Sequence, residues 1–350
     1  MKKKIDGLIK EAYKKLDIKE MYAYFIQRLI GQDDIIKKFI LKVCKYLTAI
    51  IKGNRIKCNF FLCGPSGSGK TELYRTLRDY FIMIKMPIPV IQYDVSKLTP
   101  NGFEGDSIDS LAKKILNSMT ESGNDGYAIV VLDEIDKIVV SQGDSYTAEH
   151  NEAVQSQMLT LVEGTAFHIG EECRLYNSTK TLFIGAGAFQ NCRKNTTVNN
   201  SKKMGFLAEI VEDNHQKSGV YRELTLEDMI NAGMKEELAG RFQEVLNMLP
   251  IPKKEKHRLL KLKLDEVGEE LGLHICCNKK AELKLLEVLN GPMGVRELMK
   301  TISNLAMSAE CEYVFSGGTS EALEIVIEDI DKAHALELNT HNEKLVEKEV

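Results

Sequence analysis

The sequence predicts an α/β fold in which a mostly parallel sheet lies between helices, followed by a smaller, mainly helical domain. Short, continuous apolar runs alternate with segments of helical period, as in a parallel sheet covered on both faces. A glycine-rich turn joins the first of these runs to the helix after it. Beyond Pro250 and Pro252 the strand-like runs largely disappear. A chain of 350 residues is long enough to form two cores of unequal size.

Two helical segments precede the first predicted strand. Apolar residues recur at helical spacing between Ile5 and Leu16, so the lysines around them form a solvated face of an amphipathic helix. Charged residues interrupt this segment, which excludes an export signal and predicts a cytoplasmic protein. A second helical pattern spans residues 29–53 and ends at Gly53.

The sheet and the remaining helices follow from the change of period along the chain. The predicted strands lie within residues 58–64, 89–98, 127–138 and 181–189. Helical patterns separate them at 71–84, 107–119 and 153–164, and the polar stretch 191–218 indicates a long loop or an insertion. After the prolines, helical patterns occupy 257–273, 281–289, 295–315 and 328–336, with one possible strand at 323–327. The expected organisation is an N-terminal helix (1–27), a large domain (28–250), a small domain (251–335) and a charged tail (336–350).

Composition narrows the classes of function. The net charge of -4 gives no global attraction for nucleic acid, and no apolar run is long enough to span a bilayer. The eight cysteines include no CxxC pair and read as reduced thiols. No Ser/His/Asp or Cys/His signature of a protease is present, and His150 and His168 read as structural or exposed.

A phosphate-binding loop is the strongest signal in the sequence. Its pattern GxxxxGKT is formed by Gly64, Pro65, Ser66, Gly67, Ser68, Gly69, Lys70 and Thr71. Glycines let backbone N–H groups point at phosphate oxygens, and the helix that follows presents its positive end. Lys70 supplies a full charge for the phosphates, and the Thr71 hydroxyl is a Mg²⁺ ligand. The sequence therefore predicts ATP and Mg²⁺ as ligands.

Two carboxylates end the third apolar run. We assign Asp133 to the Mg²⁺ ion and Glu134 to activation of the attacking water. The alternative is that these residues merely begin a helix, since acidic residues favour helix N-termini. The phosphate loop upstream favours the catalytic interpretation, and an intact glutamate favours hydrolysis over binding alone.

The order of the motifs resembles a known family. The segments GPSGSGKT, VVLDEIDKI, VQSQMLTLVEGT, TLFIGAGAF, ELAGRF and GPMGVREL occur in the order found in ClpX-type protein unfoldases, AAA+ ATPases of the Clp/HslU group. The similarity extends roughly over residues 28–335. It implies a P-loop AAA+ module, a hexameric ring and ATP-driven unfolding of protein substrates.

The resemblance also implies roles for four residues. Leu29 and Ile30 are similar to the segment that packs on adenine, although either residue alone could equally begin an amphipathic helix. Arg241 stands at the position of the arginine finger, which reaches the nucleotide of a neighbouring subunit. Arg296 matches the sensor-2 arginine, which touches the nucleotide of its own subunit from the small domain. A guanidinium suits both roles because it stays charged and can bind phosphate oxygens in a fork.

Two loop motifs are similar to the family's contact sites for other proteins. Phe103, between Gly102 and Gly105, resembles the aromatic pore loop that grips substrate chains; an ordinary turn is the alternative. Glu104 departs from the family's apolar residue and predicts weaker grip on acidic chains. Met204, Gly205 and Phe206 resemble the loop that docks on a ClpP-type peptidase.

Other departures leave several functions open. No four-cysteine set builds the family's N-terminal zinc-binding domain, so adaptor binding through it is not expected, and the insertion typical of HslU is missing. The leading hypothesis is an ATP-dependent unfoldase without protease activity of its own. The alternatives are a remodelling or regulatory ATPase without a peptidase and, less favoured, an AAA+ motor on DNA.

Overall fold

The computed structural model describes residues 2–54, 58–100, 105–124, 126–139, 145–169, 174–190, 222–291, 293–318 and 323–337. The chain divides into two compact units, Met1–Pro250 and Ile251–Val350. The helices of the first unit are α1 (Lys2–Lys14), α2 (Ile18–Arg28), α3 (Asp33–Lys52), α4 (Lys70–Met83), α5 (Ile108–Glu121), α6 (Ser145–Glu163), α8 (Leu226–Asn231) and α9 (Glu236–Ala239). Its strands are β1 (Phe60–Cys63), β2 (Val90–Asp94), β3 (Ala128–Asp133), β4 (Ala166–Ile169), β5 (Arg174–Asn177), β6 (Thr181–Gly187) and β7 (Val245–Asn247).

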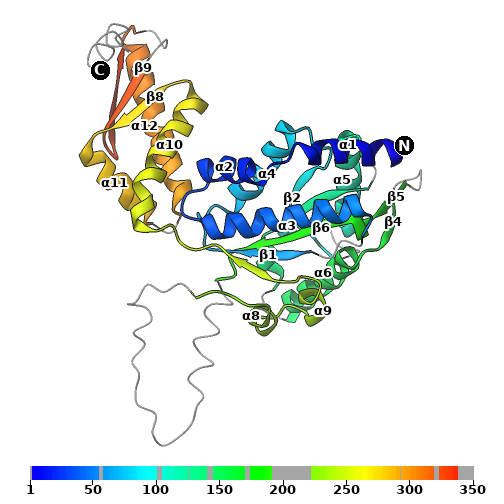
Figure 1. Cartoon of the computed structure of the whole chain (residues 1–350). Coiled ribbons are helices and arrows are strands. Elements are labelled where there is room, and N and C mark those ends of the chain that lie inside the picture. The colour runs from blue at the N-terminus through cyan, green and yellow to red at the C-terminus, as the bar shows by residue number, and fades with distance from the viewer. Residues whose placement is uncertain are drawn as a thin grey trace, which may run out of the picture. The chain divides into compact units, whose positions relative to one another are not determined.

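A five-stranded sheet forms the centre of the first unit (Figure 1). Its strand order is β2-β3-β6-β1-β7, and every pairing is parallel. The predicted α/β class with a mostly parallel sheet is confirmed. The three-residue edge strand β7 and the β4–β5 hairpin carry too little apolar periodicity to have been recognised in the sequence.

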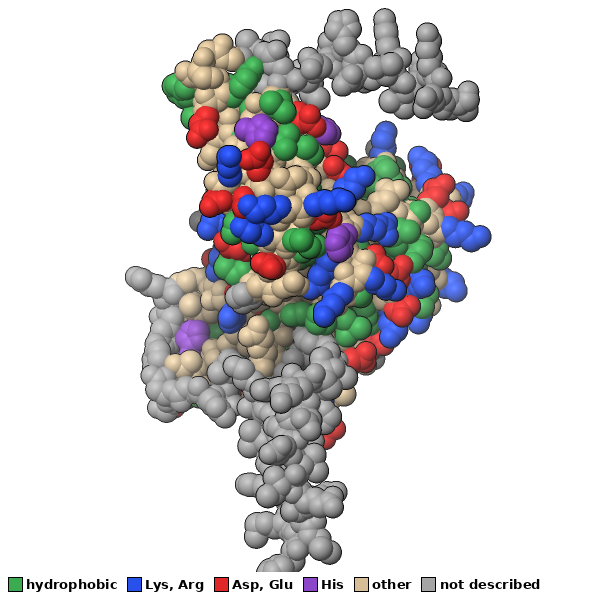
Figure 2. Space-filling view, turned by 90° about the vertical axis from the view of Figure 1, so that its left-hand side faces the viewer, with side chains coloured by type: hydrophobic (Ala, Val, Ile, Leu, Met, Phe, Trp, Pro, Cys, Tyr) green, Lys and Arg blue, Asp and Glu red, His purple; other side chains and the backbone are tan. Residues whose placement is uncertain are grey.

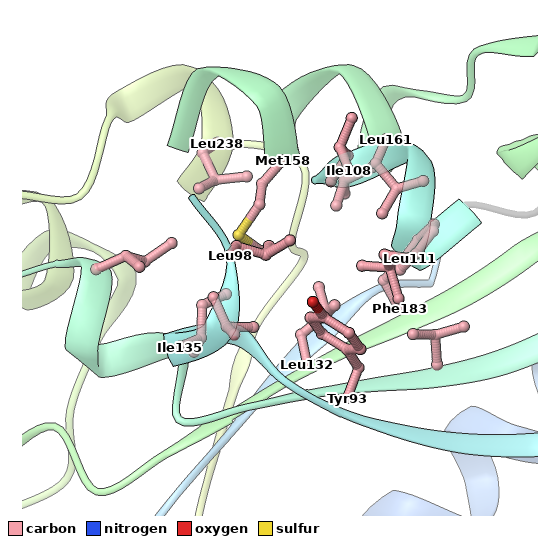
Figure 3. Packing of buried hydrophobic residues seen from close by; sticks show 14 of the residues in the cluster. Tyr93, Leu98, Ile108, Leu111, Leu132, Ile135, Met158, Leu161, Phe183 and Leu238 are labelled. Carbon is pink, nitrogen blue, oxygen red and sulfur yellow. The ribbon is translucent and has the colours of Figure 1, made fainter. Parts of the chain in front are cut away.

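Helices cover both faces of this sheet. Within β1, Phe60 and Leu62 join a core that includes residues of α2, α3 and α4, while Phe61 and Cys63 join the opposite core. Figure 3 shows Met158 of α6 and Leu111 of α5 in this second core. Every residue of β1 is fully buried, because alternate side chains of a parallel strand meet a different helical layer on each face.

The N-terminal segment contains two helices where the sequence suggested one. α1 ends at Lys14, and Asp17 caps α2 by accepting from the backbone N–H groups of Lys19 and Glu20. An aspartate at an N-cap satisfies helix donors that otherwise lack partners, so it favours a new helix start. α3 ends as predicted, at Gly53 with φ 68°.

The second unit combines three helices with a small sheet. Its helices are α10 (Lys256–Leu271), α11 (Lys279–Leu289) and α12 (Val295–Phe315), and its strands are β8 (His274–Cys277), β9 (Leu323–Asp329) and β10 (Lys332–Glu337). The strand order is β10-β9-β8, with β9–β10 antiparallel and β8–β9 parallel.

The expectation of a helix at 328–336 is wrong, because this segment forms the end of β9, the turn and most of β10. Ile325 and Ile327 are fully buried at alternate positions of β9, and pairing with β8 and β10 supplies the backbone hydrogen bonds. Strand preference depends on such neighbours more than on local composition.

Candidate functional site

The phosphate loop connects β1 to α4 at the carboxyl edge of the parallel sheet. Gly67 and Gly69 have φ values of 76° and 95°, in the left-handed region that favours glycine. Gly69 is the N-cap of α4 and has no side-chain cap, so the N–H groups of the first turn face the loop. This arrangement is a ready anion-binding site.

Lys70 is the first residue of α4 and points back into the loop. Its Nζ donates to the carbonyl oxygens of Gly64 at 2.7 Å and Pro65 at 3.0 Å. The ammonium group is therefore already held inside the loop, where phosphate oxygens can replace these carbonyls as its partners.

Gly64 has no room for a side chain. A Cβ there would lie 2.7 Å from Ser68 Oγ and 2.8 Å from Met248 Cβ. The start of the phosphate loop thus packs against Met248, the residue that follows β7. The backbone N–H of Gly64 donates to Gly187 O at the end of β6. This close packing fixes the loop on the sheet.

One predicted Mg²⁺ ligand, Asp133, is bonded to Tyr74, a residue that the sequence did not single out. The Tyr74 hydroxyl donates to Asp133 Oδ2 at 2.7 Å. Gln92 Nε2 also donates to Asp133 Oδ2, at 2.8 Å. Burial raises the pKa of Tyr74 well above its ordinary value, and the bond to Asp133 raises it further, so the phenol keeps its proton. The Asp133 carboxylate and the Thr71 hydroxyl both offer oxygen atoms, which are the ligands that Mg²⁺ prefers.

Glu134 follows Asp133 in a conformation that is uncommon for residues other than glycine. Its φ and ψ are 56° and 28°, its side chain is exposed, and its N–H donates to Asp133 Oδ1. Asp136 supports this turn by accepting from Phe189 N at 3.2 Å. Strained backbone of this kind clusters at functional sites, because surrounding contacts must hold it.

Leu29 and Ile30 are buried beside the phosphate loop. Leu29 Cδ2 lies 3.3 Å from the position of a Cβ on Gly69, so the predicted adenine-side segment and the loop are in contact. Gln32, which the sequence did not assign, connects them to the segment that follows β7. Its side-chain amide donates to Leu249 O at 2.6 Å and to Ser68 O at 3.4 Å, and it accepts from Leu249 N at 3.3 Å. In the sequence Gln32 lies inside the helical pattern 29–53, where a single polar residue gives no signal of this role.

Arg241 lies at the opposite edge of the sheet from the phosphate loop. Its carbonyl accepts from the side chain of Asn59, which precedes β1, whereas Gly64 follows β1. The guanidinium is about half exposed and pairs with Glu163. It borders a cavity of about 970 Å³ that Tyr127 and Thr181, at the amino ends of β3 and β6, also line.

The remaining predicted residues belong to the second unit or lie outside the described residues. Arg296 is exposed at the second position of α12, in the second unit. Phe103 and the segment Met204, Gly205 and Phe206 lie outside the described residues.

Together, the loop at the helix start and the acidic pair on β3 define a P-loop nucleotide-binding protein. The chain matches the AAA domain family, Cdc48 subfamily, over residues 55–245, and it belongs to that family. Within it the chain is a ClpX-like AAA+ ATPase.

Several curated relatives share this likeness. The ATP-binding subunit ClpX of the ATP-dependent Clp protease of Treponema denticola is 28% identical, and the match covers 69% of this chain and 62% of that protein. A second ClpX subunit, ClpX 2 of Wolinella succinogenes, is 30% identical over 60% of this chain and 53% of that protein. The ClpX of Porphyromonas gingivalis is 25% identical, and the match covers 91% of this chain and 81% of that protein. The chain thus spans less than two thirds of the length of the Treponema and Wolinella relatives.

Among the described residues, no helix has both the length and the apolar character that crossing a bilayer requires.

Proposed function

We propose that this chain forms a ring of six copies that hydrolyses ATP, unfolds protein substrates and moves them through a central pore. The observation that carries the proposal is the position of Arg241 and the phosphate loop at opposite edges of one sheet. A chain built this way completes its catalytic site only beside another copy. The relatives' description as ATP-binding subunits of a Clp protease supports protein as the substrate.

Hydrolysis follows from the side chains at the carboxyl edge. The loop N–H groups bind the phosphates, and Lys70 exchanges the Gly64 and Pro65 carbonyls for phosphate oxygens. Thr71 and Asp133 hold Mg²⁺, which neutralises charge on the phosphates when bound. Glu134 orients the attacking water and accepts its proton as the bond to the γ-phosphate breaks. Leu29 and Ile30 form an apolar wall for the adenine.

Arg241 acts on the nucleotide of the neighbouring subunit. Its ion pair with Glu163 is half exposed and contributes about 0–1 kcal/mol, so it opens readily when a phosphate offers a stronger partner. Arg296 binds the nucleotide of its own chain from the second unit. Hydrolysis in this scheme moves the second unit relative to the first.

The described residues on both sides of Phe103 are bonded to each other, which supports the assignment of Phe103 to a pore loop. Thr99 N donates to Asp106 O at 2.9 Å, and Asp106 N donates to Lys97 O at 3.2 Å. Tyr93 OH also donates to Asp106 Oδ2 at 2.9 Å. Gly105, with φ 142°, has no space for a Cβ beside Thr99. An aromatic residue on a loop anchored in this way can push a polypeptide without demanding a sequence.

The proposed function includes docking of a ClpP-type peptidase through Met204, Gly205 and Phe206. Apolar residues within a polar stretch suit such a contact. The described cysteines are free thiols, which supports a reducing, cytoplasmic location.

The decisive experiment follows the fluorescence of a folded, tagged fluorescent protein in the presence of ATP and a trap for unfolded chains. Wild type is expected to abolish the fluorescence, while Glu134→Gln and Phe103→Ala leave it intact. ATP hydrolysis without loss of fluorescence across several tags would favour a remodelling ATPase.

A motor on DNA is not favoured by the charge distribution. Basic and acidic side chains are interspersed over the face seen in Figure 2, and the net charge is -4. Salt-sensitive DNA binding would revive that alternative.

A further inference from the structure

Tyr74 lies buried between α4 and Asp133 in the proposed metal site. Thr71 and Tyr74 are three residues apart on α4 and therefore share one face of the helix. Asp133 lies on β3, which β6 separates from β1. The side chain of Tyr74 is 4% exposed and spans the space between the helix and Asp133.

Its hydroxyl donates its hydrogen to Asp133 Oδ2 at 2.7 Å. Tyr74 therefore shares a helix face with one proposed ligand, Thr71, and is hydrogen-bonded to the other, Asp133.

Three hydrogen-bond donors hold the carboxylate of Asp133 in one orientation. Among the described residues, Tyr74 and Gln92 donate to Oδ2 and the backbone of Glu134 donates to Oδ1. A carboxylate offers about four acceptor positions, so about one, on Oδ1, remains for the hydration shell of a metal ion. The carboxylate is therefore fixed in orientation before a cation arrives.

We propose that Tyr74 is a positioning residue of the Mg²⁺ site, which aligns Asp133 and thereby sets the affinity for the divalent cation. The inference rests on the proposed assignment of Thr71 and Asp133 as ligands. Hydrogen-bond partners of metal ligands typically change metal affinity about 10-fold to 100-fold when removed. Tyr74→Phe removes the hydroxyl and keeps the ring.

The test measures Mn²⁺ binding to the ADP-bound protein by electron paramagnetic resonance. ADP affinity in excess chelator and thermal melting are measured in parallel. Tyr74→Phe is expected to weaken Mn²⁺ binding about 10-fold, with ADP affinity in chelator unchanged. Tyr80→Phe is the matched control, because Tyr80 is buried on the same helix but packs against Tyr24.

Asp133→Asn separates the inference from its premise. If Asp133→Asn weakens Mn²⁺ binding and a folded Tyr74→Phe variant binds Mn²⁺ as tightly as wild type, or more tightly, the role of Tyr74 is refuted and the metal site stands. If Asp133→Asn has no effect, the metal assignment itself fails, and the inference fails with it. Should Tyr74→Phe not fold, Tyr74→Met, which also lacks the hydroxyl, is measured in the same titration.

Discussion

Arg241 offers a direct test of whether the catalytic site is shared between copies. Asn59, which contacts the Arg241 carbonyl, and Gly64 of the phosphate loop stand at opposite ends of β1. Five residues at a rise of about 3.3 Å place these two levels about 16 Å apart. An arginine side chain cannot span that distance, so Arg241 lies out of reach of the phosphate loop of its own chain. In the proposed ring, Arg241 instead reaches the nucleotide of another copy.

The expected size of the effect follows from the proposed role of Arg241 as an arginine finger. An arginine finger contributes about 10³–10⁵ to kcat, so Arg241→Ala should abolish nearly all ATP turnover, as should Glu134→Gln. In a ring with head-to-tail contacts, each site combines Glu134 of one copy with Arg241 of the next. Equal, random mixing of the two variants makes about one quarter of these contacts intact, so the mixture should recover up to roughly a quarter of the wild-type rate.

The assay is steady-state ATP turnover of each variant alone and of the mixture, after subunit exchange at a concentration where light scattering shows rings. Glu163→Gln is the matched control, because it breaks the ion pair with Arg241 but keeps the guanidinium, and it should retain activity. Turnover of the mixture no higher than the mean of the two variants, with mixed rings demonstrated, would refute the reasoning. So would an Arg241→Ala variant that is active alone.

Three further predictions concern single side chains of the first unit. Gln32→Ala removes the hydrogen bonds to Leu249 and Ser68 and should weaken binding of a fluorescent ADP analogue about 10-fold. Asp34→Ala is the control, because Asp34 is exposed and its loss should leave the affinity unchanged. Equal affinities of Gln32→Ala and wild type would contradict the role of Gln32. Gly185→Ala places a Cβ about 2.5 Å from Phe61 Cδ1 and should lower the free energy of unfolding in urea by about 1–3 kcal/mol. Gly7→Ala is the control, because a Cβ at Gly7 on α1 meets open space. An unchanged midpoint of urea unfolding for Gly185→Ala would exclude the predicted clash. Burial raises the pKa of the Cys58 thiol to about 11 from 9.0, so the contribution of the neutral thiol to the free energy of unfolding is complete below pH 9 and is lost as the pH rises through 11. Cys58→Ala should therefore lose less free energy of unfolding across this pH range than wild type. Equal losses in the two proteins would exclude the thiol as a cause.

The local motifs were readable without the structure because each is a continuous stretch whose chemistry depends on its own residues. The loop from Gly64 to Thr71 and the pair Asp133–Glu134 needed only a buried strand before them, and the structure places both at the carboxyl edge of the sheet. The stop at Gly53 was equally local, because a glycine with positive φ ends a helix by its own conformation.

Contacts between distant segments were not readable. Tyr74 looked like one more residue of an amphipathic helix, and only the strand order brings Asp133, 59 residues away, to its hydroxyl. Gln32 and Leu249 are 217 residues apart. The strand β10 was mistaken for helix, because pairing with β9 decides its conformation.

The sequence by itself therefore determined the class of protein and the phosphate-binding chemistry, since short-range spacing specifies both. Only the tertiary structure decided that Arg241 and the phosphate loop occupy opposite edges of one sheet, and that Tyr74 and Gln32 support the loop and its acidic partner. The physical reason is that side chains far apart in the chain meet only when parallel pairing fixes the order of the strands and buries both faces of the sheet.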